Sequence, residues 1–143
     1  MFGQRARKAK SHRPAVSGAE LEVLKVLWEF GPGTVREINK VLRQQRRRWA
    51  YTTVLTLLHR LETKGYLTRD RSRLAHIFHP AVSREGLLRQ HLRELADQLC
   101  GGTGTPLVLA LVQECRFSEK EIEQFRKLLD QLEKGKPKKK RKE

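Results

Sequence analysis

The most regular hydrophobic pattern of the chain lies between Trp49 and Leu67, in the stretch WAYTTVLTLLHRLETKGYL. Its apolar positions recur at steps of three and four residues, the period of one buried face of a helix: Val54, Leu57, Leu58 and Leu61. The opposite face is small, mostly hydroxylated and free of acidic residues: Thr52, Thr56, His59 and Thr63. Such a face permits close approach to nucleic-acid bases and phosphates. The pattern therefore predicts a helix that closes a core and meets DNA; the alternative is an ordinary amphipathic core helix.

Two shorter amphipathic helices are predicted ahead of this stretch. Ser17 with Glu20, and Thr34 with Glu37, have the spacing of a capping box, in which each side chain bonds the backbone N–H of the other residue. The sequence Gly-Pro-Gly at residues 31–33 is expected to end the first of these helices. The apolar positions expected to form the buried face of the first helix are Leu21, Leu24, Leu27 and Trp28.

The hydrophobic period changes after Gly65, a residue predicted to end the third helix in a left-handed conformation. Residues 66–69 and 75–79 form two short predicted strands around a polar turn at residues 71–73. Three helices followed by a basic hairpin is the order of a winged helix-turn-helix. In that fold the third helix enters the major groove of DNA and the hairpin contacts the adjacent backbone. Residues 17–82 are therefore predicted to be a DNA-binding domain with a small two-stranded wing.

Residues 83–134 carry three leucine- and valine-rich segments with helical spacing, separated by Gly101-Gly102 and by a capping box at Ser118 and Glu121. Three short helices cannot bury so many apolar side chains within one copy of the chain. We therefore expect a helical homodimerisation domain, with a self-contained three-helix bundle as the alternative. The predicted fold class is mainly α, a winged helix-turn-helix followed by this three-helix domain. The expected dimer contacts are Leu88, Leu92, Leu95, Leu109, Val112, Phe125 and Leu129.

The net charge of +15 is unevenly distributed along the sequence. Residues 43–79 hold nine basic and two acidic residues, whereas residues 84–133 hold seven basic and nine acidic ones. The terminal segments, residues 1–16 and 135–143, are basic and are predicted to be a disordered arm and tail. This asymmetry favours double-stranded DNA as the partner of the first half. Contacts to base edges or nearby phosphates are expected from Thr52, Thr53 and Thr56, with His59 on the same face, and contacts to phosphates from Arg60, Lys64, Arg71 and Arg73.

Other classes of function lack their sequence signatures. No glycine-rich phosphate loop or paired-carboxylate motif is present, so the protein is not expected to be an enzyme. Cys100 and Cys115 stand fifteen residues apart without a second pair, so no metal or other cofactor is expected. No apolar run approaches the roughly 18 to 20 residues of a membrane span, which predicts a cytoplasmic protein without membrane insertion. The alternative function is a winged-helix module for protein interaction or nonspecific DNA binding.

Several segments together resemble the penicillinase-repressor family of the BlaI/MecI type over about residues 17–134: ELEVLKVLW, TVREINKVL, WAYTTVLTLLHRLETKGYLTR, IFHPAVS, PLVLALVQ and SEKEIEQFRKLL. The resemblance implies a dimeric winged-helix transcriptional repressor of palindromic operators. It places DNA contacts on Thr52, Thr53 and Leu55, with Arg60 later in the same helix. Members with arginine at the position of Leu55 can make a polar contact there, whereas leucine can only touch a thymine methyl group.

The resemblance also implies how repression ends, through cleavage triggered by a membrane sensor of metalloprotease type. The family is cut within the apolar helix that follows the Gly-Gly pair, at an Asn-Phe bond, and the matching bond here joins Ala110 and Leu111. A cut at this bond would remove the last helix and separate two monomers. Copper-responsive relatives carry a C-terminal cysteine cluster, and this sequence lacks it.

Overall fold

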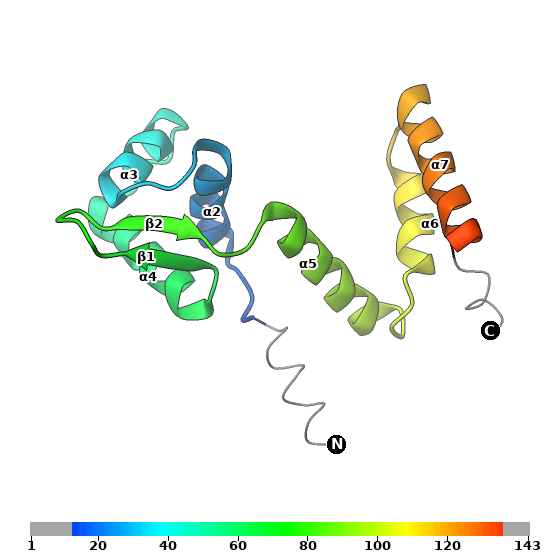
Figure 1. Ribbon diagram of the computed structural model, residues 1–143, viewed down its shortest axis with the longest axis horizontal. Coiled ribbons are helices and arrows are strands. Elements are labelled where there is room, and N and C mark those ends of the chain that lie inside the picture. The colour runs from blue at the N-terminus through cyan, green and yellow to red at the C-terminus, as the bar shows by residue number, and fades with distance from the viewer. Residues whose placement is uncertain (1–12, 136–143) are drawn as a thin grey trace, which may run out of the picture. The chain divides into compact units, whose positions relative to one another are not determined.

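The computed structural model describes residues 13–135 (Figure 1), so most of the predicted basic arm and tail lies outside the described residues. These residues divide into two compact units that meet between Leu92 and Arg93. The mainly helical fold class is confirmed, with a single two-stranded sheet in the described part. The elements are α2 (Gly18–Phe30), α3 (Val35–Gln44), α4 (Tyr51–Lys64), β1 (Leu67–Asp70), β2 (Ile77–Pro80), α5 (Arg84–Leu99), α6 (Thr105–Glu114) and α7 (Glu119–Gly135).

The helix ends follow the local sequence signals. Ser17 Oγ accepts the backbone N–H of Glu20 at 3.1 Å, and Glu20 Oε1 accepts the N–H of Ser17 at 2.9 Å, so the first capping box is confirmed. The same reciprocal pair opens α3 and is confirmed as well. α4, the helix predicted to contact DNA, begins after Ala50, which supplies no side-chain cap. It ends at Gly65, whose φ of 91° is left-handed as predicted.

The core of the first unit lies among α2, α3, α4 and the sheet. All four apolar positions predicted for α4 are buried, and Tyr66 and Phe78 are the largest fully buried side chains. The prediction for α2 was incomplete, because Val23 and Val26 are buried as well, whereas Leu21 and Trp28 are only partly buried. The reason is that α3, α4 and β2 all pack against α2, so its buried face is wider than one stripe.

The predicted hairpin is confirmed, but its strands are shifted: β1 begins and ends one residue later than predicted, and β2 covers residues 77–80 instead of 75–79. β1 and β2 are antiparallel, with Leu67 opposite Pro80 and Asp70 opposite Ile77, so residues 71–76 form a longer loop. The backbone N–H of Ser72 donates to Asp70 Oδ1 at 2.9 Å, a local turn that ends β1. β2 also pairs through Phe78 with Gly33, which ties the wing to the loop between α2 and α3.

The first half of α5 belongs to the first unit, although the sequence predicted a domain boundary at residue 83. Ser83 Oγ accepts the N–H of Gly86 at 2.9 Å and caps the helix. Leu87 is buried in the core of this unit, and Gln90 donates to the hydroxyl of Tyr66 at 3.3 Å. The division therefore falls inside α5 because the start of that helix is packed and hydrogen-bonded to the winged-helix core.

The second unit contains the antiparallel pair α6 and α7 (Figure 1), which forms no core of its own. Neither helix has a buried residue. The predicted capping box of Ser118 and Glu121 is confirmed, and the rings of Phe117 and Phe125 meet edge to face at 5.0 Å. The α6–α7 pair therefore buries none of its apolar side chains by itself. None of the helices within residues 13–135 is long and apolar enough to cross a membrane.

Candidate nucleic-acid interface

The buried stripe of α4 fixes which of its side chains face outward. The predicted outward face is exposed, at Thr52, Thr56, His59 and Thr63. Thr53 and Arg60, which were also predicted to contact DNA, are exposed as well. Thr56 donates its hydroxyl to the backbone oxygen of Thr52 at 2.9 Å, so an outside partner meets the lone pairs of Thr56. These lone pairs can accept hydrogen bonds from the exocyclic amino groups of adenine or cytosine. The outward face of α4 therefore combines small hydroxyl side chains with one imidazole and one guanidinium group.

A groove of about 630 Å³ lies beside this face, between α4, the start of α3 and the wing. Leu55 lines it and is partly buried against the core, so this side chain lies on the flank of α4 toward the wing. None of the described residues that line the groove is acidic. The lining comprises Thr34, Val35, Arg36, Tyr51, Leu55, His59, Arg69, Leu74, Ala75, His76 and Phe78.

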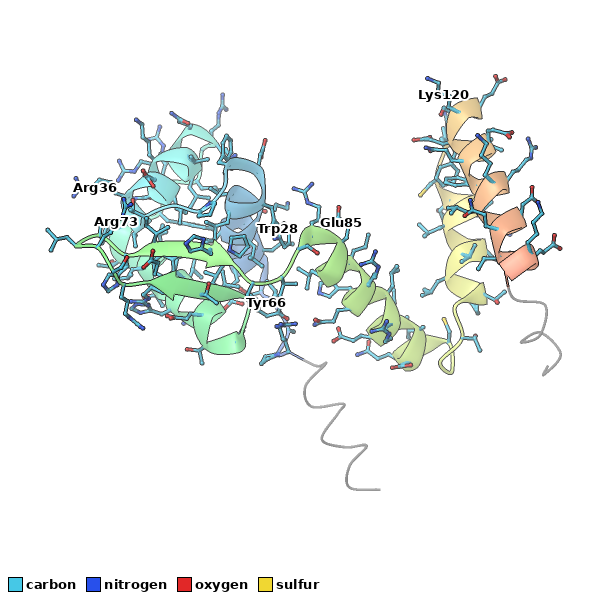
Figure 2. All side chains as sticks on the ribbon, viewed as in Figure 1. Trp28, Arg36, Tyr66, Arg73, Glu85 and Lys120 are labelled. Atoms are coloured by element: carbon cyan, nitrogen blue, oxygen red, sulfur yellow. The ribbon has the colours of Figure 1, made fainter. Side chains whose placement is uncertain are left out.

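Arg36 is a basic residue of this surface that the sequence analysis did not include. It is exposed in the first turn of α3 and lines the groove together with His59 and His76. Figure 2 shows Arg36 and Arg73 at the same end of the winged-helix unit. The helix of Arg36 was predicted only as a structural support. The position of Arg36, two residues after the N-cap Thr34 in the first turn of the second helix, was the available signal.

Lys64 does not belong to the exposed basic surface, contrary to the prediction that it neutralises a phosphate. Its ammonium group donates to Glu20 Oε1 at 2.6 Å and to the backbone oxygen of Ala15 at 2.8 Å. The side chain of Glu20 is 1% exposed. Burial raises the pKa of Glu20, but hydrogen bonds from Lys64 and Ser17 outweigh it and leave the pKa below its ordinary 4.5. The charge of Lys64 is thus committed to an internal carboxylate.

The wing carries the other predicted basic residues. Arg71 and Arg73 are exposed in its loop, and Leu74 beside them is fully exposed. Asp70 stays ionised near them, because hydrogen bonds from the backbone and hydroxyl of Ser72 lower the pKa of its carboxyl group. The guanidinium of Arg71 lies 3.7 Å from Glu62 of α4. The wing therefore presents a positive loop that also contacts the recognition helix.

These features define a class of protein. Three helices, the third with an outward face free of acidic residues, followed by a basic two-stranded wing, are the architecture of winged-helix DNA-binding regulators. A model of the family described as penicillinase repressor matches residues 16–131. The chain belongs to the penicillinase-repressor family of the BlaI/MecI type, whose members are DNA-binding transcriptional repressors. These are non-enzymatic regulators, in agreement with the expectation drawn from the sequence.

Individual relatives agree with this assignment. The chain is 32% identical over 121 residues to the transcriptional regulator BlaI of Mycobacterium tuberculosis, covering 81% of this chain and 83% of that protein. It is 26% identical over 118 residues to the penicillinase repressor of Bacillus licheniformis, covering 82% and 91%. A solution structure of monomeric Bacillus licheniformis BlaI with the blaP half-operator aligns with 52% of this chain and 90% of that chain, at 31% identity and a TM-score of 0.45.

Proposed function

We propose that this protein represses transcription as a homodimer bound to a palindromic operator, with α4 in the major groove and the wing on the adjacent backbone. The outward face of α4 carries the proposal, because it is exposed, free of acid and flanked by the basic wing. A relative, BlaI of Bacillus licheniformis, has been solved with an operator half-site. In this arrangement Thr52, Thr53 and Thr56 meet base edges or nearby phosphates. Leu55 is left with an apolar contact, and Arg60, Arg71 and Arg73 neutralise phosphates.

The dimer is supported by exposed apolar side chains on α5, α6 and α7. Leu88, Leu92, Leu95 and Leu99 form a stripe along α5 at steps of three and four residues, and each is at least 39% exposed. On α6 and α7 the exposed apolar residues include Leu109, Val112, Phe125 and Leu129. Helices gain most of their stability from tertiary packing, so this pair needs an additional surface. A second copy of the chain supplies one with the same composition.

Relief of repression is proposed to follow cleavage of the bond between Ala110 and Leu111, by a protease linked to a sensor. Both residues are exposed in the middle of α6. A cut there would separate α7 from the rest of the chain, and the dimer would lose that helix. Mass spectrometry of protein recovered from cells with the target genes induced tests this step. An intact chain under those conditions would exclude cleavage.

Selection of bound sequences from random duplex DNA tests the proposed function as a whole. A repressor of this kind should enrich a palindrome, and its affinity should fall steeply with salt concentration. An interaction module would show indifference to DNA. Repeating the selection with Thr53→Gln should change the enriched bases, because a longer amide side chain on α4 prefers adenine. An unchanged motif would remove Thr53 from the base contacts.

Arg71→Ala should weaken binding to all duplexes alike. Arg71 lies in the wing loop, where its guanidinium is expected to neutralise one phosphate. Removing it should reduce the slope of log affinity against log salt by about one unit. Fluorescence anisotropy with one palindromic and one scrambled duplex measures both quantities. The wing assignment fails if neither affinity nor slope changes.

A further inference from the structure

Glu62 is the acidic residue of α4, and it lies on the flank of that helix that faces the wing. An acid on a recognition helix is unfavourable by charge alone, because it repels the phosphates that basic residues attract. Its side chain is 27% exposed and therefore does not point freely into solvent. The contacts of Glu62 account for its presence.

The carboxylate of Glu62 holds two arginines of the wing at once. Oε1 lies 2.7 Å from Nη2 of Arg69 on β1, and Oε2 lies 3.7 Å from Nη2 of Arg71 in the loop. Each oxygen thus serves one guanidinium group. One side chain of α4 therefore contacts both β1 and the loop of the wing.

Arg69 carries this link across the hairpin. Its side chain is 12% exposed, and its guanidinium lies 4.8 Å from the centre of the Phe78 ring on β2. Its Nη1 is 3.4 Å from Nδ1 of His76, which lies just before β2. Its Nε–H has no hydrogen-bond partner among the described residues. A guanidinium buried in this way depends on Glu62 as its anionic partner. Loss of that carboxylate would therefore release Arg69, and with it β1, from α4.

We propose that Glu62 is a positioning residue for DNA binding, which holds the wing against α4 and aims Arg71 at the phosphate backbone. This inference rests on the proposed function. It predicts that an acidic residue increases the affinity of the protein for DNA. Its mechanism is geometric: a fixed wing loses less conformational freedom when it meets the duplex than a detached one.

Glu62→Gln separates the geometric effect from the charge effect, because the two have opposite signs. Charge counting predicts tighter binding, since the variant has one negative charge fewer. The positioning role predicts binding to a labelled random-sequence duplex that is about three- to tenfold weaker. The control Glu29→Gln removes the same charge at an exposed position in the last turn of α2, and its affinity should stay equal or rise.

Two further measurements keep the test decisive. Arg69→Lys keeps the net charge but replaces the planar guanidinium by an ammonium group, so it should also weaken DNA binding. This variant tests the proposal even if Glu62→Gln folds poorly. In an Arg71→Ala background, the loss of DNA affinity caused by Glu62→Gln should be smaller, because one of the two arginines that Glu62 contacts is gone. Amide hydrogen exchange at Ser72 should accelerate in Glu62→Gln while exchange in the α2–α4 core stays slow.

The outcomes are distinct. If folded Glu62→Gln binds the duplex as tightly as the wild type or more tightly, the positioning role is overturned. Unchanged affinity of Arg69→Lys would overturn it as well. If the wild-type protein itself shows no salt-dependent binding to duplex DNA, the proposed function fails first, independently of Glu62.

Discussion

Replacing Leu129 by lysine is expected to convert the proposed homodimer into monomers and to lower the apparent affinity for a two-half-site operator by about a hundredfold or more. Leu129 is 61% exposed on α7, within the apolar face that the proposed dimer would cover. A lysine there would place an ammonium group in an apolar interface, where it is costly without a partner. Sedimentation velocity measures the state of assembly. Fluorescence anisotropy with one- and two-half-site duplexes measures how much affinity is lost when one dimer no longer binds both half-sites.

Gln131→Lys is the matched control for this variant. It adds the same charge to the same helix but lies outside the apolar stripe, so the dimer should persist. Binding to a single half-site should be similar for the wild type and both variants, because the winged-helix unit is unaltered. A wild-type protein that sediments as a monomer at micromolar concentration would contradict the dimer. So would a Leu129→Lys variant that remains dimeric.

Lys64→Ala is expected to lower the free energy of unfolding by about 3 kcal/mol, because it leaves a buried carboxylate without its cation. Glu20 is 1% exposed, and the ammonium of Lys64 at 2.6 Å is the charged partner that the structure gives it. The slope of log DNA affinity against log salt should stay the same, because Lys64 is committed inside the protein. Urea unfolding and the salt titration measure the two effects. Arg60→Ala, an exposed change on the same helix, should do the reverse and weaken DNA binding without loss of stability.

The pH dependence of stability gives an independent check on this pair. The folded pKa of Glu20 lies below its ordinary 4.5, so the pair stabilises the fold above that value. This contribution should disappear as the pH falls from 4.5 through the lowered folded pKa. In Lys64→Ala, burial without the cation should raise the pKa of Glu20, so the stability gap between wild type and variant should narrow on acidification. Equal stability at pH 7, or a constant gap down to acidic pH, would contradict this assignment.

The ends and faces of the helices could be predicted from the sequence because they depend on neighbours within a few residues. The capping boxes at Ser17 and Thr34 join residues three apart, and both are present in the structure. The buried stripe of α4 follows from the helical period alone. The same period placed Thr52 and Thr56 outward, and their exposure follows from it.

The partners of the charged residues were decided only by the tertiary structure. Lys64 follows the exposed pattern of a basic helix end, yet it meets Glu20, which is 44 positions away in the chain. Arg69 and Arg71 look equivalent in the sequence, but packing on Phe78 buries one and leaves the other exposed. The wider buried face of α2 likewise depends on three elements that pack against it. Local periodicity determines which side of a helix is apolar, whereas long-range packing decides which groups meet that side and which charges remain available to DNA.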